Sequence, residues 1–258
     1  MASSCEENAS APTAWRRAPL DPCITAGEVH VWRAELDVSS TALAGLEATL
    51  TEAELDQARR YRLDHLGRRF IASRAVLKDV LARYLAVGPA AVEFTYGRWG
   101  KPALGAQSGA PDIRFNLTHS EGMALVAVAL GRETGVDLER LKPEMATEAI
   151  ADRFFSPEEA AEIRTFSGEA HTKVFFACWT RKEAYLKAKG EGLSFKLDRF
   201  RVSVLPGAPA ALLSSCDNSA EPERWAMTEL EPGPGFVASM VVEAPLGKLK
   251  LWRWGPPE

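Results

Sequence analysis

The sequence has 258 residues, of which 46% are hydrophobic and 26% are charged, as is usual for a compact globular protein. The net charge of −4 argues against a nucleic-acid binder, because such proteins usually present a basic contact face. Four scattered cysteines lack zinc-site spacing and are expected to be reduced thiols, which predicts a cytoplasmic location. No apolar stretch reaches membrane-spanning length, so no membrane association is expected.

The first half of the chain mixes strand and helix patterns. Residues 1–27 are rich in Ser, Ala, Pro and Glu, and they predict a mobile leader. Alternating apolar and polar residues predict a half-buried strand over 29–36. Thr51 opens a helix with a capping-box pattern, and apolar residues at helical spacing predict a second helix over 70–85. Strands are then expected over 92–96, 113–116 and 123–130.

The second half repeats this order of strand, helices and strands. A tight turn over 131–134 leads into a strand that contains Asp137. Helices are expected over 143–153, 157–166 and 171–189, and strands over 200–205, 225–230, 236–244 and 248–252. The pattern predicts an α+β protein with halves at 28–134 and 135–258.

Three carboxylates and one lysine form the most informative pattern. Glu183 and Lys187 stand four residues apart and share one face of a helix, and Asp137 and Glu139 alternate on one face of a strand. Carboxylates that converge without neutralising cations favour a hard divalent ion such as magnesium, usually together with substrate phosphates. Taken alone, each pair is more often a solvated surface pair.

Five short motifs, in order over residues 100–193, resemble the 4′-phosphopantetheinyl transferases of the Sfp type. They are Gly100-Lys101-Pro102, Phe115-Asn116-Leu117-Thr118-His119-Ser120, Gly135-Val136-Asp137-Leu138-Glu139, Arg153-Phe154-Phe155-Ser156-Pro157-Glu158-Glu159, and Trp179 to Lys187 with Gly190-Glu191-Gly192-Leu193. The resemblance implies two similar halves related by a pseudo-twofold axis, with the active site in the cleft between them. The chain length resembles the monomeric members of this family.

The resemblance also implies an activity and a set of residues for it. The 4′-phosphopantetheine arm of coenzyme A would be transferred to a serine of an apo acyl or peptidyl carrier protein, with release of adenosine 3′,5′-bisphosphate. Asp137, Glu139 and Glu183 would hold Mg²⁺, and Lys187 would contact the reacting phosphate. The base is either Glu183 or a water held by Glu139.

The 3′-phosphate of coenzyme A needs its own donors, and the resemblance implies Lys101, Thr118 and His119. The family prototype carries basic residues on an early helix where this chain has Glu54 and Gln57. The charge is expected from other basic residues of that region, which are Arg62, Arg69 and Arg74.

Two other classes remain open at this point. A metal-dependent phosphohydrolase acting on a nucleotide-like pyrophosphate would use the same carboxylates on water. A non-catalytic coenzyme-binding module is disfavoured because no expected catalytic residue is missing. The aromatic residues of the last motif region, Phe175, Phe176, Trp179 and Tyr185, are expected to wall the metal site. The carrier itself is not predicted, although analogy favours polyketide or nonribosomal-peptide secondary metabolism.

Overall fold

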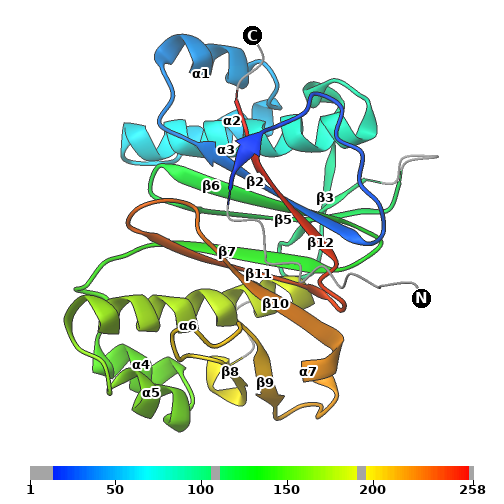
Figure 1. The fold of residues 1–258 in the computed structure, drawn as a ribbon. Coiled ribbons are helices and arrows are strands. Elements are labelled where there is room, and N and C mark those ends of the chain that lie inside the picture. The colour runs from blue at the N-terminus through cyan, green and yellow to red at the C-terminus, as the bar shows by residue number, and fades with distance from the viewer. Residues whose placement is uncertain (1–13, 106–110, 191–195, 256–258) are drawn as a thin grey trace, which may run out of the picture.

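The computed structural model describes residues 14–105, 111–190 and 196–255. Two sheets lie face to face, and each is covered on its outer side by helices (Figure 1). In these ranges no helix is both long enough and apolar enough to cross a membrane.

The N-terminal sheet has the strand order β1–β12–β2–β6–β5. β2 and β5 each pair antiparallel with β6, whereas β12 runs parallel to both β1 and β2. The bounds are Arg16–Arg17 for β1, Glu28–Glu35 for β2, Ile113–Ser120 for β5, Met123–Leu130 for β6 and Lys248–Arg253 for β12.

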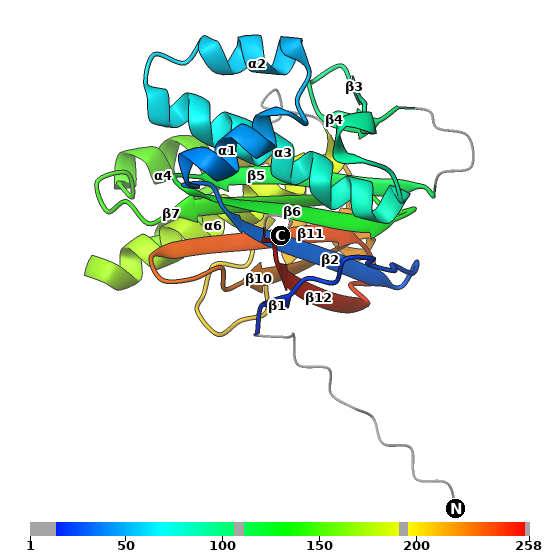
Figure 2. The same cartoon turned by 90° about the horizontal axis from the view of Figure 1, so that it is seen from above.

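Three helices form the outer layer over this sheet (Figure 2): α1 at Ser40–Glu47, α2 at Glu52–Arg59 and α3 at Asp64–Leu85. The buried face of α3 includes Val76, Leu77 and Val80, and it packs on the sheet together with Trp32 and Phe115. A short turn at Pro89–Ala91 and a hairpin of β3, Phe94–Tyr96, and β4, Pro102–Leu104, complete this half.

The C-terminal sheet has the order β10–β11–β7, all antiparallel, with bounds Trp225–Leu230 for β10, Phe236–Glu243 for β11 and Thr134–Arg140 for β7. Its outer layer contains α4 at Glu148–Phe154, α5 at Pro157–Ile163 and α6 at Gly168–Lys189. The turn Leu197–Arg199, the hairpin of β8, Phe200–Val202, and β9, Leu212–Ser215, and the short α7, Glu221–Arg224, lie beside them.

The two halves repeat one plan. In the first, β2 is followed by the 22-residue helix α3, then by β5 and β6, and β6 lies between the other two strands. In the second, β7 is followed by the 22-residue helix α6, then by β10 and β11, and β11 lies in the middle. The predicted α+β class with two similar, pseudo-twofold halves is therefore confirmed.

A third hydrophobic core lies between the sheets. Alternate residues of β6, such as Leu125 and Ala127, meet Val136 and Leu138 of β7 and Met240 of β11. This apolar layer lies next to the contact of the edge strand β5 with β7, which brings the polar ends of both strands together.

Parts of the structure differ from the prediction at the two chain ends. Within the expected leader, 1–13 lie outside the described residues, but Arg16 and Arg17 pair with Trp252 and Arg253. β12 was assigned to the C-terminal half, yet it is hydrogen-bonded to β2 in the N-terminal sheet. The division at 134 and 135 thus stays a prediction about the chain, while the last strand returns to the first half.

Candidate functional site

A glycine of β7 lets α6 pack directly on this strand. A Cβ atom at Gly135 would overlap with the carbonyl oxygen of Ala184 and the backbone nitrogen of Ala188. Glycine alone permits this approach, which sets the α6 side chains at 183 and 187 beside the β7 side chains at 137 and 139.

Asp137 is the centre of the site and is only 4% exposed. Its Oδ1 accepts from Lys187 Nζ at 2.6 Å and from Thr118 Oγ1 at 3.3 Å, while Lys187 Nζ also lies 3.1 Å from Thr118 Oγ1. Its Oδ2 is buried without a hydrogen-bond partner in the described part of the chain. Burial raises the pKa of Asp137, and the charge of Lys187 opposes this rise.

Two further carboxylates lie within the field of Asp137. Glu139 Oε2 accepts from Ser120 Oγ at 3.0 Å, and burial followed by the charge of Asp137 raises the pKa of Glu139. Burial followed by the charge of Asp137 raises the pKa of Glu183 to about 7, and Glu139 adds to this effect. Three carboxylates thus share the charge of one lysine, which leaves an excess of negative charge at one point, as a cation site requires.

The carboxylate oxygens of Asp137, Glu139 and Glu183 are of the type that magnesium binds, but they are not arranged as a complete metal site. Among residues 14–105, 111–190 and 196–255, no three carboxylate, imidazole or thiol groups are arranged to hold a metal ion. Lys187 Nζ is bonded to Asp137 Oδ1, the oxygen beside the unpaired Oδ2. Magnesium usually takes one or two carboxylates and completes its shell with water and phosphate oxygens, so the unpaired oxygen of Asp137 supports this ion.

The residues expected at the 3′-phosphate differ in their surroundings. His119 is exposed, and the surrounding protein followed by the charge of Lys187 lowers its pKa. Lys101 lies in the turn between β3 and β4, and its Nζ donates to Glu133 Oε2 at 3.0 Å and to the carbonyl oxygens of Thr134 and Ala188, both at 3.3 Å. In this structure Lys101 therefore ties the hairpin to the ends of β7 and α6.

The early-helix arginines have carboxylate partners. Arg69 forms two bonds with Asp37, at 2.7 and 2.8 Å, and one of 3.2 Å with Glu121. Arg74 Nε lies 3.5 Å from Glu54 Oε1. Arg69 and Arg74 thus pair with different carboxylates, and their role at the coenzyme stays a prediction.

Of three pockets in the described part of the chain, two are lined by residues of these elements. One of about 550 Å³ lies at the junction of the halves and is lined by Asp37, Arg69 and Glu121 of the first and by Arg140 and Lys142 of the second. One of about 270 Å³ is lined by Arg153, Phe154, Glu183, Leu186, Lys196, Leu197 and Asp198.

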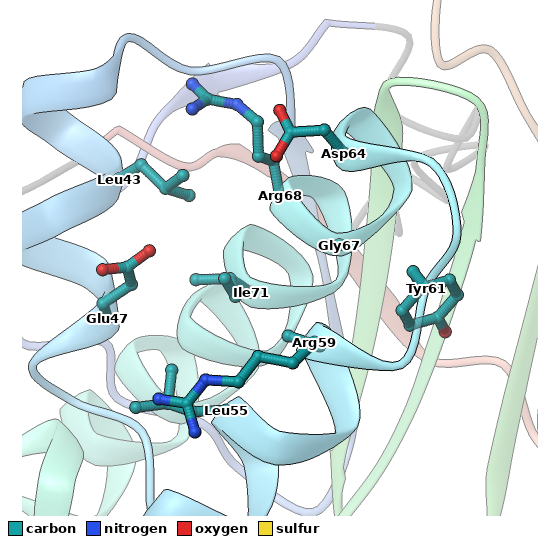
Figure 3. A pocket seen from close by; sticks show the side chains of 10 residues that line it. Leu43, Glu47, Leu55, Arg59, Tyr61, Asp64, Gly67, Arg68 and Ile71 are labelled. Carbon is teal, nitrogen blue, oxygen red and sulfur yellow. The ribbon is translucent and has the colours of Figure 1, made fainter.

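The third pocket, of about 410 Å³, opens between α1, α2 and α3 (Figure 3). Leu43, Leu55 and Ile71 give it an apolar base, and charged residues such as Arg59 and Asp64 also line it. No expected site residue lines it, so it is separate from the carboxylate cluster.

The four aromatic residues expected to wall the metal site lie in or against the core of the C-terminal half. Phe175, Phe176 and Tyr185 are buried in the core between α6 and the neighbouring elements, and Trp179 packs against that core. Trp179 stands four residues before Glu183 and contacts Phe154, which lines a pocket together with Glu183, so a wall of aromatic residues at the metal site stays a prediction. Tyr185 donates to Glu221 Oε2 at 2.5 Å.

The sequence analysis also missed polar residues that support the site. Asn116 and Ser120 of β5 bond to β7. The sequence signals were the family motif over 115–120, in which no role was assigned to these two residues, and the alternation of polar residues through Asn116, Thr118 and Ser120. Such alternation is usually a solvated strand face, and here it faces the second sheet instead.

Comparison with known proteins identifies the family. The model of the 4′-phosphopantetheinyl transferase superfamily matches residues 133–239, which include β7, α6 and both carboxylate motifs. The 4′-phosphopantetheinyl transferase HetI of a Nostoc species is 38% identical over 240 residues, which are 93% of this chain and 98% of that protein. The chain therefore belongs to the 4′-phosphopantetheinyl transferase superfamily.

Two further matches are more distant. The 4′-phosphopantetheinyl transferase Sfp of Bacillus subtilis is 29% identical over 57% of this chain and 63% of that protein. A crystal structure of a holo-(acyl-carrier-protein) synthase from Bacillus anthracis, in complex with CoA (3′,5′-ADP), aligns with 43% of this chain and 94% of its own. Its TM-score of 0.36 and identity of 21% are too low to support a conclusion.

Proposed function

We propose that this protein transfers the 4′-phosphopantetheine moiety of coenzyme A to a serine of an apo acyl or peptidyl carrier protein and releases adenosine 3′,5′-bisphosphate. Membership of the transferase superfamily supports the reaction, and the buried cluster of Asp137, Glu139, Glu183 and Lys187 supports its location. The observation that carries the location is the unpaired buried Oδ2 of Asp137 beside two carboxylates with raised pKa values. No comparison favours the phosphohydrolase alternative.

Asp137, Glu139 and Glu183 would hold magnesium, and Lys187 would contact the reacting phosphate. The ion, when bound, would stabilise the charge that develops on the leaving phosphate. Lys187 now bonds to Asp137 and would turn to the phosphate when coenzyme A binds, which would leave both oxygens of Asp137 available to the ion. The serine proton would pass to Glu183 or to a water held by Glu139.

The coenzyme 3′-phosphate would be contacted by Lys101, Thr118 and His119, with Arg69 and Arg74 as further basic residues of the first half. Thr118 is held at the centre by Lys187 and Asp137, and His119 follows it on the exposed face of β5. We also propose that the protein is a monomer, since both halves would contribute to one site within one chain. We further propose a cytoplasmic location and a carrier of secondary metabolism.

The decisive experiment is incubation of purified apo carriers with this protein, coenzyme A and magnesium, followed by intact-mass measurement. We expect a gain of one phosphopantetheine, abolished by a chelator or by replacing the carrier serine with Ala. Adenosine 3′,5′-bisphosphate should form in step with modified carrier. Comparable release without an acceptor would contradict transfer and identify hydrolysis.

A further inference from the structure

β7 and β2 occupy the same place in their halves, but their outer edges are completed differently. The outer edge of β2 pairs with β12, whereas β7 has no strand partner beyond β11 in the described ranges. Hydrogen bonds at the ends of the β7–β11 ladder, Glu243 N to Glu133 O at 3.0 Å and Leu141 N to Gly235 O at 2.9 Å, involve odd-numbered residues of this segment. Even-numbered residues of β7 therefore point their N–H groups away from β11.

Side chains of β5 satisfy that free edge. Val136 N donates to Asn116 Oδ1 at 2.9 Å, and Arg140 N donates to Ser120 Oγ at 3.0 Å. Between them, the N–H of Leu138 faces the carboxylate of Asp137 and opposes the rise of its pKa. An unsatisfied N–H at this edge would cost free energy, so these side chains take over the task that β12 performs for β2.

Ser120 differs from Asn116 because it also touches a carboxylate. Its hydroxyl accepts from Arg140 N and donates its single proton to Glu139 Oε2 at 3.0 Å. The backbone bond therefore fixes the direction of the bond to Glu139. Glu139 is only partly buried, so without Ser120 its carboxylate would be freer to rotate away from Asp137.

We propose that Ser120 is a positioning residue that orients Glu139 toward the cation shared with Asp137 and Glu183, an inference that rests on the proposed function. Groups that hydrogen-bond a metal-ligating carboxylate fix its direction before the ion arrives, and their loss typically weakens metal binding about 10–100-fold. Thr118 performs the equivalent task at Asp137, so two alternate residues of one strand orient the two carboxylates of the other.

The test measures Mn²⁺ as a probe, by electron paramagnetic resonance titration of the full chain with and without coenzyme A. Ser120→Ala should weaken Mn²⁺ binding about 10–100-fold, and Ser120→Thr, which keeps the hydroxyl, should bind within about threefold of wild type. Asn116→Ala is the matched control, because it removes the same kind of bond to β7 without touching a carboxylate. It should lower the melting temperature at least as much as Ser120→Ala, yet change Mn²⁺ affinity less than about threefold.

Several outcomes would overturn the proposal. They are wild-type affinity in Ser120→Ala, equal weakening in Ser120→Thr, equal weakening in Asn116→Ala, and no Mn²⁺ binding by wild type under either condition. Failure of the proposed function is a separate result: wild type would bind Mn²⁺ in a Ser120-dependent manner but would leave every apo carrier unmodified. If Ser120→Ala is unstable, the comparison of Ser120→Thr with Asn116→Ala still decides.

Discussion

Two lysines five residues apart on α6 form ion pairs with buried carboxylates, and the two pairs differ in how completely they are bonded. Lys182 donates to Glu159 at 2.7 Å and to the carbonyl oxygens of Leu197 and Phe200, at 2.8 and 2.6 Å. Lys187 binds Asp137 at 2.6 Å, but Asp137 Oδ2 is left without a partner in the described residues.

The difference shows how one helix serves stability on one face and chemistry on the other. Glu159 is also fully bonded, since it accepts from Ser156 N at 2.8 Å and from Val202 N at 2.7 Å. Its pair with Lys182 joins α5, α6 and the turn before β8, and these bonds use both oxygens of Glu159 and all three protons of Lys182. The pair of Lys187 and Asp137 keeps an oxygen available, as expected where a ligand completes the set.

The largest expected effect is on the satisfied pair. Lys182→Met keeps most of the side-chain volume but leaves Glu159 buried without its counter-charge. We expect a loss of about 3–5 kcal/mol in the free energy of unfolding, measured by denaturant titration. Lys173→Met is the control, because Lys173 forms an exposed pair with Glu169 on the same helix and should cost less than about 0.5 kcal/mol. Similar losses in the two variants would contradict the comparison.

The second prediction concerns activity at the unsatisfied pair. Asp137→Asn and Glu183→Gln keep shape but remove charge, and each should lower the rate of carrier modification by roughly two or more orders of magnitude. Their melting temperatures should stay at or above that of wild type, because burial opposes ionisation of both groups. Glu169→Gln, at an exposed position of α6, should leave the rate unchanged. A variant with wild-type turnover at saturating magnesium would remove that residue from the site.

Local patterns in the sequence predicted much of this fold. The capping box of Thr51 and Glu54 is present, and the predicted strands over 123–130 and 225–230 have the observed bounds. These elements depend on short-range chemistry: a side chain caps a nearby N–H, or an alternating or apolar run meets a core. The carboxylates of β7 and α6 could be paired because each lies on one face of its own element.

Long-range features could not be predicted in this way. The parallel pairing of β12 with β2 joins strands from near the two ends of the chain, and nothing in the segment 248–252 specifies that partner. Phe175 and Tyr185 are buried in the core of the C-terminal half. Their burial depends on how α6 packs against its neighbours, which the sequence of an aromatic-rich helix does not reveal. Helix α1 was missed because only Leu43 and Leu46 of its eight residues are buried.

The third prediction addresses the anionic end of the coenzyme. If Lys101 and His119 contact the 3′-phosphate, replacing either by Ala should weaken coenzyme A about 10–150-fold, the value of about 1.5–3 kcal/mol for a bond to a charged group. Binding of 3′-dephospho-coenzyme A should hardly change, because that ligand lacks the group. Isothermal titration of both ligands measures the difference.

Lys101 makes this test sharp, because its three present acceptors give it a structural task as well. Equal weakening of both ligands by Lys101→Ala would assign it that task alone. His119 has no such set of bonds in its described surroundings, so a selective effect there would identify a ligand contact.

The smallest expected effect concerns His30, a second buried group with an unpaired atom, far along the chain from the site. His30 is 1% exposed, its Nδ1 lies 2.7 Å from the hydroxyl of Tyr84, and its Nε2 lies 3.7 Å from Glu28 Oε2 and has no hydrogen-bond partner in the described residues. Tyr84 accepts from Trp32 Nε1 at 2.8 Å, so its own proton is free to donate to Nδ1 of neutral His30. Burial, and then the charge of Lys250, lowers the pKa of His30 to about 4.

In the unfolded chain His30 has an ordinary pKa near 6.5, so between about pH 6.5 and 4 it is protonated in the unfolded chain and neutral in the folded protein. Stability from this group is therefore complete above about pH 6.5 and is lost as the pH falls toward 4. We expect wild type to lose about 1 kcal/mol between about pH 7.5 and 5.5 by this route, and His30→Gln to lack that part of the slope. His65→Gln, at an exposed position of α3, should keep the wild-type slope, and carrier modification at about pH 7.5 should be unchanged in both. These results would mean that an unpaired buried atom indicates a functional site only where further charged groups lie close to it, as at Asp137. A lower rate of carrier modification in His30→Gln would contradict this conclusion.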